Sequence, residues 1–291
     1  MDLGRVGIWT FAFELQPAAR VREAAAEIEG LGYGAIWIPE ALGREALSHA
    51  AVLLAATRRI PVATGIANIW ARDAMAMAAG QKTLAEAWPG RFLLGIGVSH
   101  APIVGMRGHG YDRPLTFMRQ YLDAMDAAIY NPPPPAAAPR VIGALAPKML
   151  ALAAERTEGA HPYFVPPEHT RRARAALGPG KLLAPEQAVV LERDATVARG
   201  VARRHMQMYL QLPNYVNNLR RLGFGDDDLQ RGGSDRLVDA IVAWGDVGAV
   251  VDRVRAHHEA GADHVCIQVL PREATALPVP QWQTLAAALL R

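Results

Sequence analysis

Residues 91–100 read Arg-Phe-Leu-Leu-Gly-Ile-Gly-Val-Ser-His. Its apolar run, Phe92 to Ile96, is short and does not alternate with polar residues. Parallel strands that are covered by helices on both faces have this pattern. A helical pattern follows from Pro114 to Tyr130. The stretch therefore predicts a buried parallel strand followed by a helix.

The same strand-then-helix unit recurs along the chain. The expected strands are Val6 to Trp9, Ala35 to Ile38, Ile60 to Ala63, Phe92 to Ile96, Val141 to Gly143, Gly159 to His161, Ala188 to Leu191 and Val265 to Leu270. Eight such units in 291 residues predict an α/β fold, a TIM (β/α)8 barrel, with a doubly wound open sheet as the alternative.

The excess length lies mostly at residues 213–244, which we interpret as a helical insertion within the barrel. Ser234 is a plausible N-cap for a helix there. The proline-rich run Asn131 to Pro139 is expected to be a stiff extended connector. Because the β/α rhythm continues across it, we expect a single domain over 1–291.

Composition excludes several classes of protein. With 51% hydrophobic residues the chain is not disordered, and a net charge of +3 without a run of like charge argues against a nucleic-acid partner. The single cysteine, Cys266, excludes a disulfide framework within the chain, and the histidines lack metal-ligand spacing. No signal-peptide or membrane-span pattern is present, so we expect a cytoplasmic protein with no membrane partner and no metal.

Residues that directly follow the strands are the candidates for chemistry, because barrel sites form at the carboxyl ends of strands. Glu40 follows one strand end, where it is either a catalytic carboxylate or a solvated loop charge. Ser99 and His100 follow two glycines, which allow a ligand or a backbone to approach closely. His100 is a candidate proton donor, because an unperturbed imidazole titrates near neutral pH.

The same segment also resembles the active site of a serine hydrolase. Residues 97–101 nearly match a nucleophile elbow, with Ala101 in place of the last glycine. An elbow needs a helix directly after the serine, and Pro102, Gly105, Gly108 and Gly110 predict a loop. Hydrolase chemistry is therefore the weakest of the alternatives.

An anion site is expected at Gly143 to Lys148, where a strand meets a helix with proline near its first turn. Free N–H groups and the positive end of the helix dipole would face the barrel mouth there. An ordinary β/α loop is the alternative.

Three segments together resemble the luciferase-like monooxygenase superfamily over nearly the whole chain. They are residues 32–40, GYGAIWIPE; residues 91–100; and residues 147–160, PKMLALAAERTEGA. Within that superfamily, Gly159 to Tyr163 followed by Pro167 to Thr170 is similar to the branch of oxidoreductases that use the deazaflavin coenzyme F420.

The resemblance implies a TIM barrel with a late insertion and a cofactor in the barrel mouth. It implies a non-prolyl cis peptide at Gly65-Ile66 against the back of the cofactor ring. The implied ring-lining residues are Gly65, Ile66, Asn68, Gly97, Val98, Ser99 and His100, and those implied to hold the ribityl phosphate are Gly143, Ala144, Leu145, Ala160 and His161. Two positions depart from many relatives: Ala144, where glycine is frequent, and His100.

The leading hypothesis is an oxidoreductase that transfers a hydride between F420 and a small organic substrate. His100 and Glu40 are the expected catalytic residues, with Glu40 as the partner of His100 or a substrate contact. The alternatives are an FMN-dependent monooxygenase with a separate reductase and a non-catalytic flavin-binding barrel. A substrate-side wall is expected from Tyr209, Asn214, Tyr215, Asn217 and Phe224.

The resemblance also implies a homodimer packed through barrel helices. Apolar side chains in excess of one inward stripe favour the second and third helices for this contact: Ala50, Val52, Leu53, Leu54, Met75 and Met77.

Overall fold

The computed structural model describes residues 1–290, and in that range all eleven strands belong to one parallel sheet. The path of the sheet is β10-β9-β11-β1-β2-β3-β5-β6-β7-β8, with β4 paired to β5. The strands are β1 Val6–Trp9, β2 Ile36–Ile38, β3 Val62–Thr64, β4 Ala67–Asn68, β5 Phe92–Gly97, β6 Arg140–Ile142, β7 Gly159–Ala160, β8 Leu182–Leu183, β9 Glu186–Leu191, β10 Ala243–Gly245 and β11 Val265–Val269.

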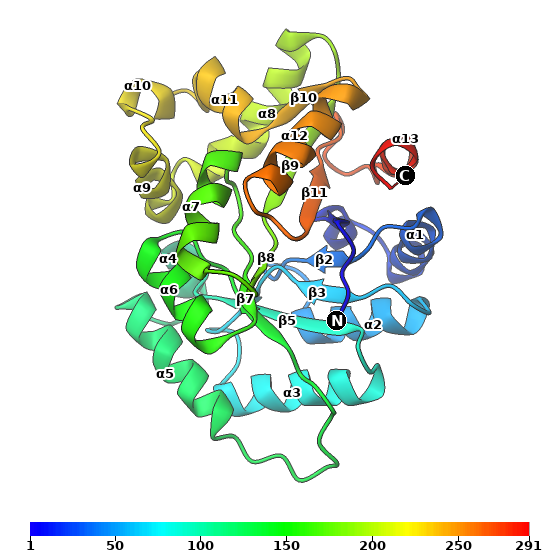
Figure 1. Cartoon of the computed structure of the whole chain (residues 1–291), viewed down its shortest axis with the longest axis vertical. Helices are drawn as coiled ribbons and strands as arrows, with labels where there is room; N and C mark the ends of the chain where they lie inside the picture. Colours follow the sequence, from blue (N-terminus) through cyan, green and yellow to red (C-terminus); the bar gives the residue numbers. More distant parts are fainter. Residues whose placement is uncertain (291) are drawn as a thin grey trace.

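The sheet closes into a barrel because β8 and β9 form one nearly continuous segment. On one side of it, Ala184 N–H donates to the Ala160 carbonyl at 3.0 Å. On the other, Cys266 N–H donates to the Pro185 carbonyl at 2.9 Å. The segment thereby joins β7 to β11, and the predicted (β/α)8 barrel is confirmed (Figure 1).

Helices surround the strands (Figure 1). They are α1 Ala18–Leu31, α2 Ala46–Ala56, α3 Ala74–Ala87, α4 Ala101–Met106, α5 Pro114–Asp126, α6 Pro147–Arg156, α7 Pro167–Leu177, α8 Ala195–Tyr209, α9 Pro213–Arg221, α10 Asp226–Leu229, α11 Asp235–Ile241, α12 Val247–Glu259 and α13 Val279–Leu289. Helices α5, α6, α7 and α9 begin with proline, whose fixed φ suits a first turn that does not need its N–H.

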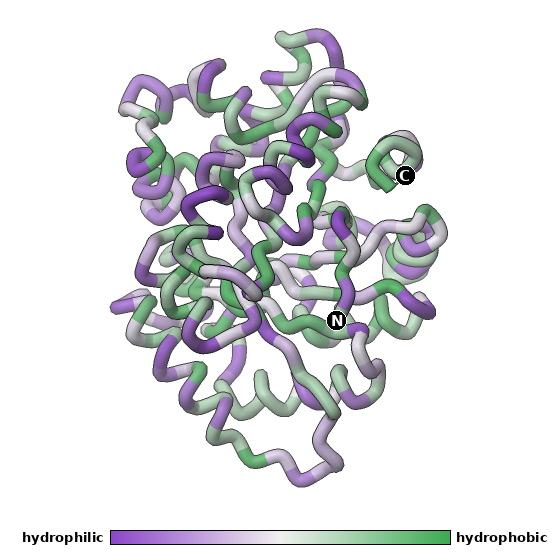
Figure 2. The backbone as a smooth tube through the Cα atoms, in the orientation of Figure 1, coloured by the Kyte–Doolittle hydropathy of each residue, from purple (hydrophilic) through white to green (hydrophobic). Residues whose placement is uncertain are grey.

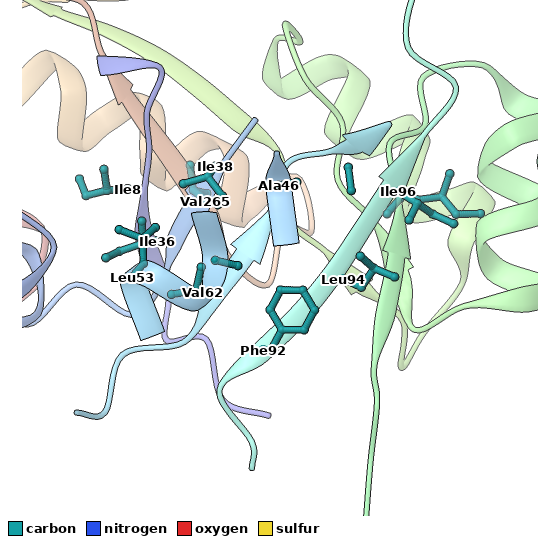
Figure 3. Packing of buried hydrophobic residues seen from close by; sticks show 14 of the residues in the cluster. Ile8, Ile36, Ile38, Ala46, Leu53, Val62, Phe92, Leu94, Ile96 and Val265 are labelled. Atoms are coloured by element: carbon teal, nitrogen blue, oxygen red, sulfur yellow. The ribbon is translucent and has the colours of Figure 1, made fainter. Parts of the chain in front are cut away.

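Both faces of the strands are buried, which explains why the strand sequences do not alternate. Ile36, Val62 and Phe92 pack with Leu53 of α2 in the outer layer, between sheet and helices (Figure 3). The neighbouring residues on the strands form a second cluster inside the barrel: Trp9, Trp37, Ala63, Leu93, Val141, Ala184 and Cys266. Hydrophobic residues accordingly line the central strands, while hydrophilic ones gather on the outer helices (Figure 2).

Two local expectations differ from the structure. The segment after Ser99 is the helix α4 and not a loop, because Pro102 lies in its first turn, where proline is tolerated. The region 213–244 is helical only to Ile241, and β10 then pairs with β9. No helix in residues 1–290 is long and apolar enough to cross a membrane.

Candidate active site

A cavity of about 430 Å³ opens at the carboxyl ends of the strands. One side of it is formed by residues that follow β1, β2, β3, β5, β6 and β7, and the other by the end of α8 and by α9. The sequence-predicted residues that line it are Glu40, Gly65, Ile66, Gly97, Val98, Ser99, His100, Gly143, Ala144, Leu145 and His161, with Tyr209, Asn214, Tyr215 and Asn217 from the insertion side.

Three of the expected residues do not line the cavity. Asn68 is fully buried, and its Oδ1 accepts from Trp70 N–H at 3.0 Å. Ala160 is buried within β7, where its carbonyl accepts a ladder hydrogen bond. Phe224 packs under the Arg236 guanidinium, 4.5 Å from the ring centroid. These residues support the walls and do not form them.

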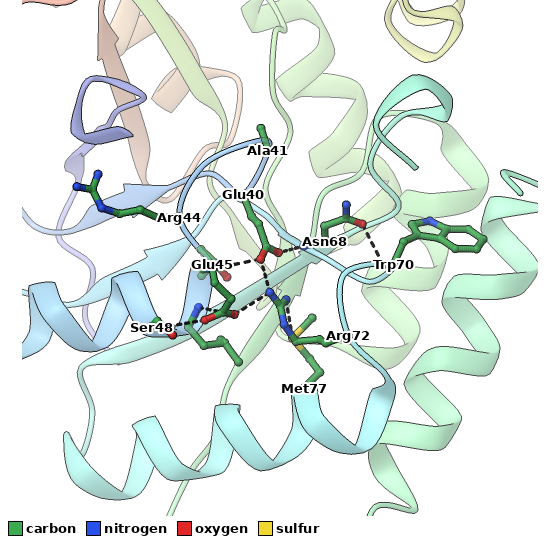
Figure 4. A network of polar contacts seen from close by, with 12 residues as sticks. Glu40, Ala41, Arg44, Glu45, Ser48, Asn68, Trp70, Arg72 and Met77 are labelled. Carbon is green, nitrogen blue, oxygen red and sulfur yellow. Dashed lines mark hydrogen bonds and ion pairs between the residues drawn. The ribbon is translucent and has the colours of Figure 1, made fainter. Parts of the chain in front are cut away.

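Glu40 is held in a network of polar contacts (Figure 4). Its carboxylate accepts from Asn68 N–H at 2.7 Å and from Ala46 N–H at 3.2 Å. It also pairs with Arg72, which lies 2.7 Å from Glu45. Both Glu40 oxygens are therefore engaged within the protein, and this geometry favours a positioning role over the expected catalytic one.

Ile66 forms the centre of one cavity wall. A Cβ at Gly97 would lie 2.6 Å from Ile66 Cγ1, and a Cβ at Gly143 would lie 3.1 Å from Ile66 Cγ2. The Gly65–Ile66 peptide bond is cis, at the position that the resemblance implies. The strand-end glycines therefore make room first for the Ile66 side chain, and Ile66 presents the surface to the cavity.

His161 lies on the same side of the cavity, next to Gly65, and is 1% exposed. Its Nδ1 is 2.6 Å from the Ala184 carbonyl oxygen, and burial lowers the pKa of His161 to about 4. The imidazole is therefore neutral, with the hydrogen on Nδ1 and a lone pair on Nε2. A lone pair cannot bind a phosphate oxygen, so this geometry does not favour the expected phosphate role.

His100 borders the cavity beside Tyr215, with ring centroids 5.3 Å apart. Burial lowers the pKa of His100, and a side-chain hydrogen bond with Asn214 acts in the opposite direction. Nδ1 of His100 is buried without a partner within residues 1–290. His100, at the end of β5, therefore contacts Tyr215 of α9 across the cavity.

Several aromatic residues of the cavity were not singled out by strand-end reasoning. Trp9, Phe11, Tyr111 and Tyr163 all line it. Tyr163 O–H donates to Gln268 Oε1 at 2.9 Å, and its oxygen is 2.8 Å from the Tyr209 hydroxyl. Trp9 ends β1, so the strand-end rule applied to the first strand would have found it.

The rim of the cavity is cationic. Lys148, in the first turn of α6, and Arg221, at the end of α9, both line it. Neither belongs to an ion pair within residues 1–290, while the lining carboxylate Glu40 is paired with Arg72. No side chain caps the first turn of α6. This rim is therefore suited to an anionic group.

Glu186 is fully buried on β9, next to the aromatic residues. Its Oε2 accepts from Phe164 N–H at 3.1 Å, and Oε1 has no partner within residues 1–290. Burial raises the pKa of Glu186 to about 8, so the carboxyl group is protonated at neutral pH.

Two other chemistries lack the residues they need. Ser99 adopts φ 56° and is followed by α4, as a nucleophile elbow would require, so the expectation of a loop there is wrong. Its hydroxyl nevertheless forms no hydrogen bond with a histidine in the part of the chain that the structure describes. Within the same residues no group of three His, Cys, Asp or Glu side chains could hold a metal.

Comparison with known proteins identifies the family. The family model "luciferase-like monooxygenase" matches residues 3–264, so the chain belongs to that family. A Mycobacterium tuberculosis protein provisionally named a coenzyme F420-dependent oxidoreductase is 28% identical over 200 residues. That match covers 57% of this chain and 56% of the relative, so the chain spans about half the length of the curated relative it matches.

Solved structures share the fold. An F420-dependent secondary alcohol dehydrogenase in complex with an F420-acetone adduct superposes with TM-score 0.77 at 14% identity, covering 97% of this chain and 96% of the other. The oxygenating constituent of 3,6-diketocamphane monooxygenase from Pseudomonas putida, in complex with FMN, gives TM-score 0.73 at 15% identity, covering 97% and 95%. At these identities the likeness shows the fold alone.

Proposed function

We propose that this protein is an oxidoreductase that transfers a hydride between coenzyme F420 and a small organic substrate. The observation that carries the proposal is the match to the M. tuberculosis relative, whose name specifies F420. The cavity supports it, because an apolar wall and a cationic rim suit a flat ring with an anionic tail. F420, when bound, supplies or accepts the hydride, and the protein orients it.

The residues divide between the parts of such a cofactor. Ile66 would contact the ring, and so would Gly97, Val98 and Ser99, which line the cavity next to it. Gly143, Ala144, Leu145 and Lys148 would hold the phosphate, because they lead into the uncapped first turn of α6.

A proton must accompany the hydride when a carbonyl or an alkene is reduced. His100 and the Tyr215 hydroxyl border the cavity side by side, and either can donate it. Tyr209 is less suited, because Tyr163 donates to Gln268 and Tyr209 must then donate to Tyr163. We assign proton donation to His100, with Tyr215 beside it.

We also propose a homodimer through α2 and α3. Of the apolar residues expected there, Ala50, Leu53, Leu54 and Met77 are buried in the monomer core. Met75 is 59% exposed, so its side chain is free to pack against the same face of a second subunit. Sedimentation of the wild type at micromolar concentration should show a dimer, and Met75→Glu should shift it toward monomer; a wild-type monomer would remove the proposal.

The test is an anaerobic assay of F420 oxidation state. Reduced F420 is mixed with aldehydes, ketones and activated alkenes, and oxidised F420 with alcohols. Enzyme-dependent change in F420 absorbance supports the proposal. Turnover seen only with reduced FMN and oxygen would favour the monooxygenase alternative, and binding without turnover of any compound would favour the non-catalytic barrel.

A further inference from the structure

Helix α9 presents a stripe of polar side chains to the cavity. Asn214, Asn217 and Arg221 all line the cavity, and all three are exposed. They are three and four residues apart along the helix, so they lie on one face of it. Tyr215 flanks this stripe near the start of α9 and contacts the His100 ring. The stripe therefore runs from the residues assigned to proton donation to the last turn of α9.

Arg221 lies at the far end of the stripe, and its charge is not balanced within residues 1–290. Its carbonyl oxygen accepts from Arg172 Nη1 of α7 at 2.7 Å, while its guanidinium forms no ion pair or hydrogen bond there. Among the described residues that line the cavity, only Glu40 is acidic, and Glu40 is paired with Arg72. The backbone of Arg221 is thus anchored to α7, and its charge is available to a ligand.

Arg220 provides a comparison within the same turn of the helix. A cation in the last turn of a helix interacts favourably with the helix dipole, and this applies to both arginines. Arg220, however, lies about 100° further round the helix and pairs with Asp226 Oδ1 at 2.7 Å. It does not line the cavity. The dipole therefore does not explain why Arg221 faces the cavity without a partner.

The two cations of the cavity lie at different places. Lys148 follows β6 and lies at the uncapped first turn of α6, which suits the cofactor phosphate. Arg221 lies on the α9 side, and the helix rises about 9 Å between Tyr215 and Arg221. One guanidinium balances a monoanion such as a carboxylate, whereas a phosphate monoester carries nearly two charges. Apolar side chains, those of Ile103 and Met208, also line the cavity.

We propose that the substrate of this enzyme carries a carboxylate that Arg221 binds, with the reacting carbonyl group at the other end of the molecule, beside His100. Asn217 lies between the two ends and can donate its amide N–H to the same carboxylate. The inference rests on the proposed function for the reaction. The carbonyl carbon accepts a hydride from reduced F420 and its oxygen accepts a proton from His100, so the products are a hydroxy acid and oxidised F420. The carboxylate itself is unchanged.

The kinetic test compares 6-oxoheptanoate with its methyl ester, which has the same ketone and no charge. Reduced F420 is supplied without oxygen, and its oxidation is followed by absorbance. In the wild type, kcat/KM should be at least about fivefold higher for the acid, the upper end for an exposed ion pair. Arg221→Met should remove this preference by raising KM for the acid, with little change in kcat. Turnover of acid and ester with equal kcat/KM in the wild type overturns the inference.

Arg220→Met is the matched control, because it removes the same charge from the same turn of α9. It should keep the preference for the acid, and an equal loss there overturns the inference. Arg221→Lys keeps the charge but loses the planar fork, so it should restore part of the preference. The F420 Kd of Arg221→Met should stay within about twofold of the wild-type value. A larger rise overturns the inference, because Arg221 then binds the anionic tail of the cofactor.

A binding measurement separates this inference from the proposed function. Calorimetry with hexanoate and methyl hexanoate needs no turnover, and it uses protein saturated with F420, or cofactor-free protein where F420 does not bind. Hexanoate should bind the wild type more tightly than its ester, and Arg221→Met should bind both equally. This result without F420-dependent turnover supports the carboxylate site and ends the proposed function. The absence of both turnover and a preference for hexanoate overturns both proposals.

Discussion

The two sides of the cavity differ in how firmly their groups are held. The strand-end wall (Gly65, Ile66, Gly97, Gly143 and His161) consists of glycines packed around Ile66 and of an imidazole fixed by stacking on Trp37 and a hydrogen bond. The α8–α9 wall (Tyr209, Asn214, Tyr215, Asn217 and Arg221) has three exposed polar side chains, those of Asn214, Asn217 and Arg221. A wall whose side chains are held in place suits a cofactor that is the same in every turnover. A wall with exposed polar side chains suits substrates of different shapes.

His100 lies where the two walls meet, and its replacement should have the largest effect. His100→Ala should lower kcat by about 10²-fold or more, because a general acid typically contributes that much, while F420 affinity stays within about twofold. In the wild type, kcat/KM should fall as pH rises through the pKa of His100, which burial places below its ordinary value. This decrease in kcat/KM with rising pH should be absent in His100→Ala. Full kcat in the variant would make His100 a wall residue.

A change in the strand-end wall should act on the cofactor. Gly97→Ala adds a Cβ 2.6 Å from Ile66 Cγ1 and pushes Ile66 into the cavity, so the F420 Kd should rise about tenfold. The matched control is Gly200→Ala on α8, where a Cβ meets nothing within 4 Å. Equal affinities for the two variants, measured by fluorescence titration, would show that Ile66 does not contact the cofactor.

The rim should contribute a smaller, salt-dependent part of cofactor affinity. Lys148→Glu should weaken F420 binding by a few-fold at low salt, and the difference should shrink as ionic strength rises. The control, Lys82→Glu, changes the same charge on α3, away from the cavity. If the loss of F420 affinity did not depend on salt, or were equal in Lys82→Glu, the phosphate would not bind next to Lys148.

The stability of the protein should depend on whether the buried carboxyl group of Glu186 is protonated. Its pKa of about 8 is raised above that of an unfolded chain, so its contribution to stability is lost as pH rises through that value. Glu186→Gln should therefore melt higher than the wild type above pH 8, and the difference should narrow toward pH 5. A difference in Tm that does not change with pH would mean that Glu186 is not protonated in the native state.

Much of the strand-end wall could be predicted from the sequence, because it follows from a local pattern. A buried parallel strand ends at a definable residue, and in a barrel the residues after it face the mouth. That reasoning placed His100 at the cavity, and the family resemblance implied Ile66. The resemblance also implied Asn68 and Ala160, which do not line the cavity, because adjacent residues on a strand face opposite sides.

The rest depends on contacts between distant parts of the chain. Arg72 engages the Glu40 carboxylate from another loop, and Tyr163 contacts Tyr209 and Gln268, on α8 and β11. The spacing of residues along the chain does not predict such long-range contacts. The tautomer of His161 likewise depends on the Ala184 carbonyl, more than twenty residues away in sequence.

Binding of a deazaflavin at the strand-end wall can be measured by equilibrium titration of the wild-type protein with F420 and with FMN under identical conditions, followed by fluorescence quenching. Saturable 1:1 binding of F420, at least about tenfold tighter than that of FMN, is the predicted result. Tighter binding of FMN, or no saturable binding of F420, would show that the wall is not a deazaflavin site.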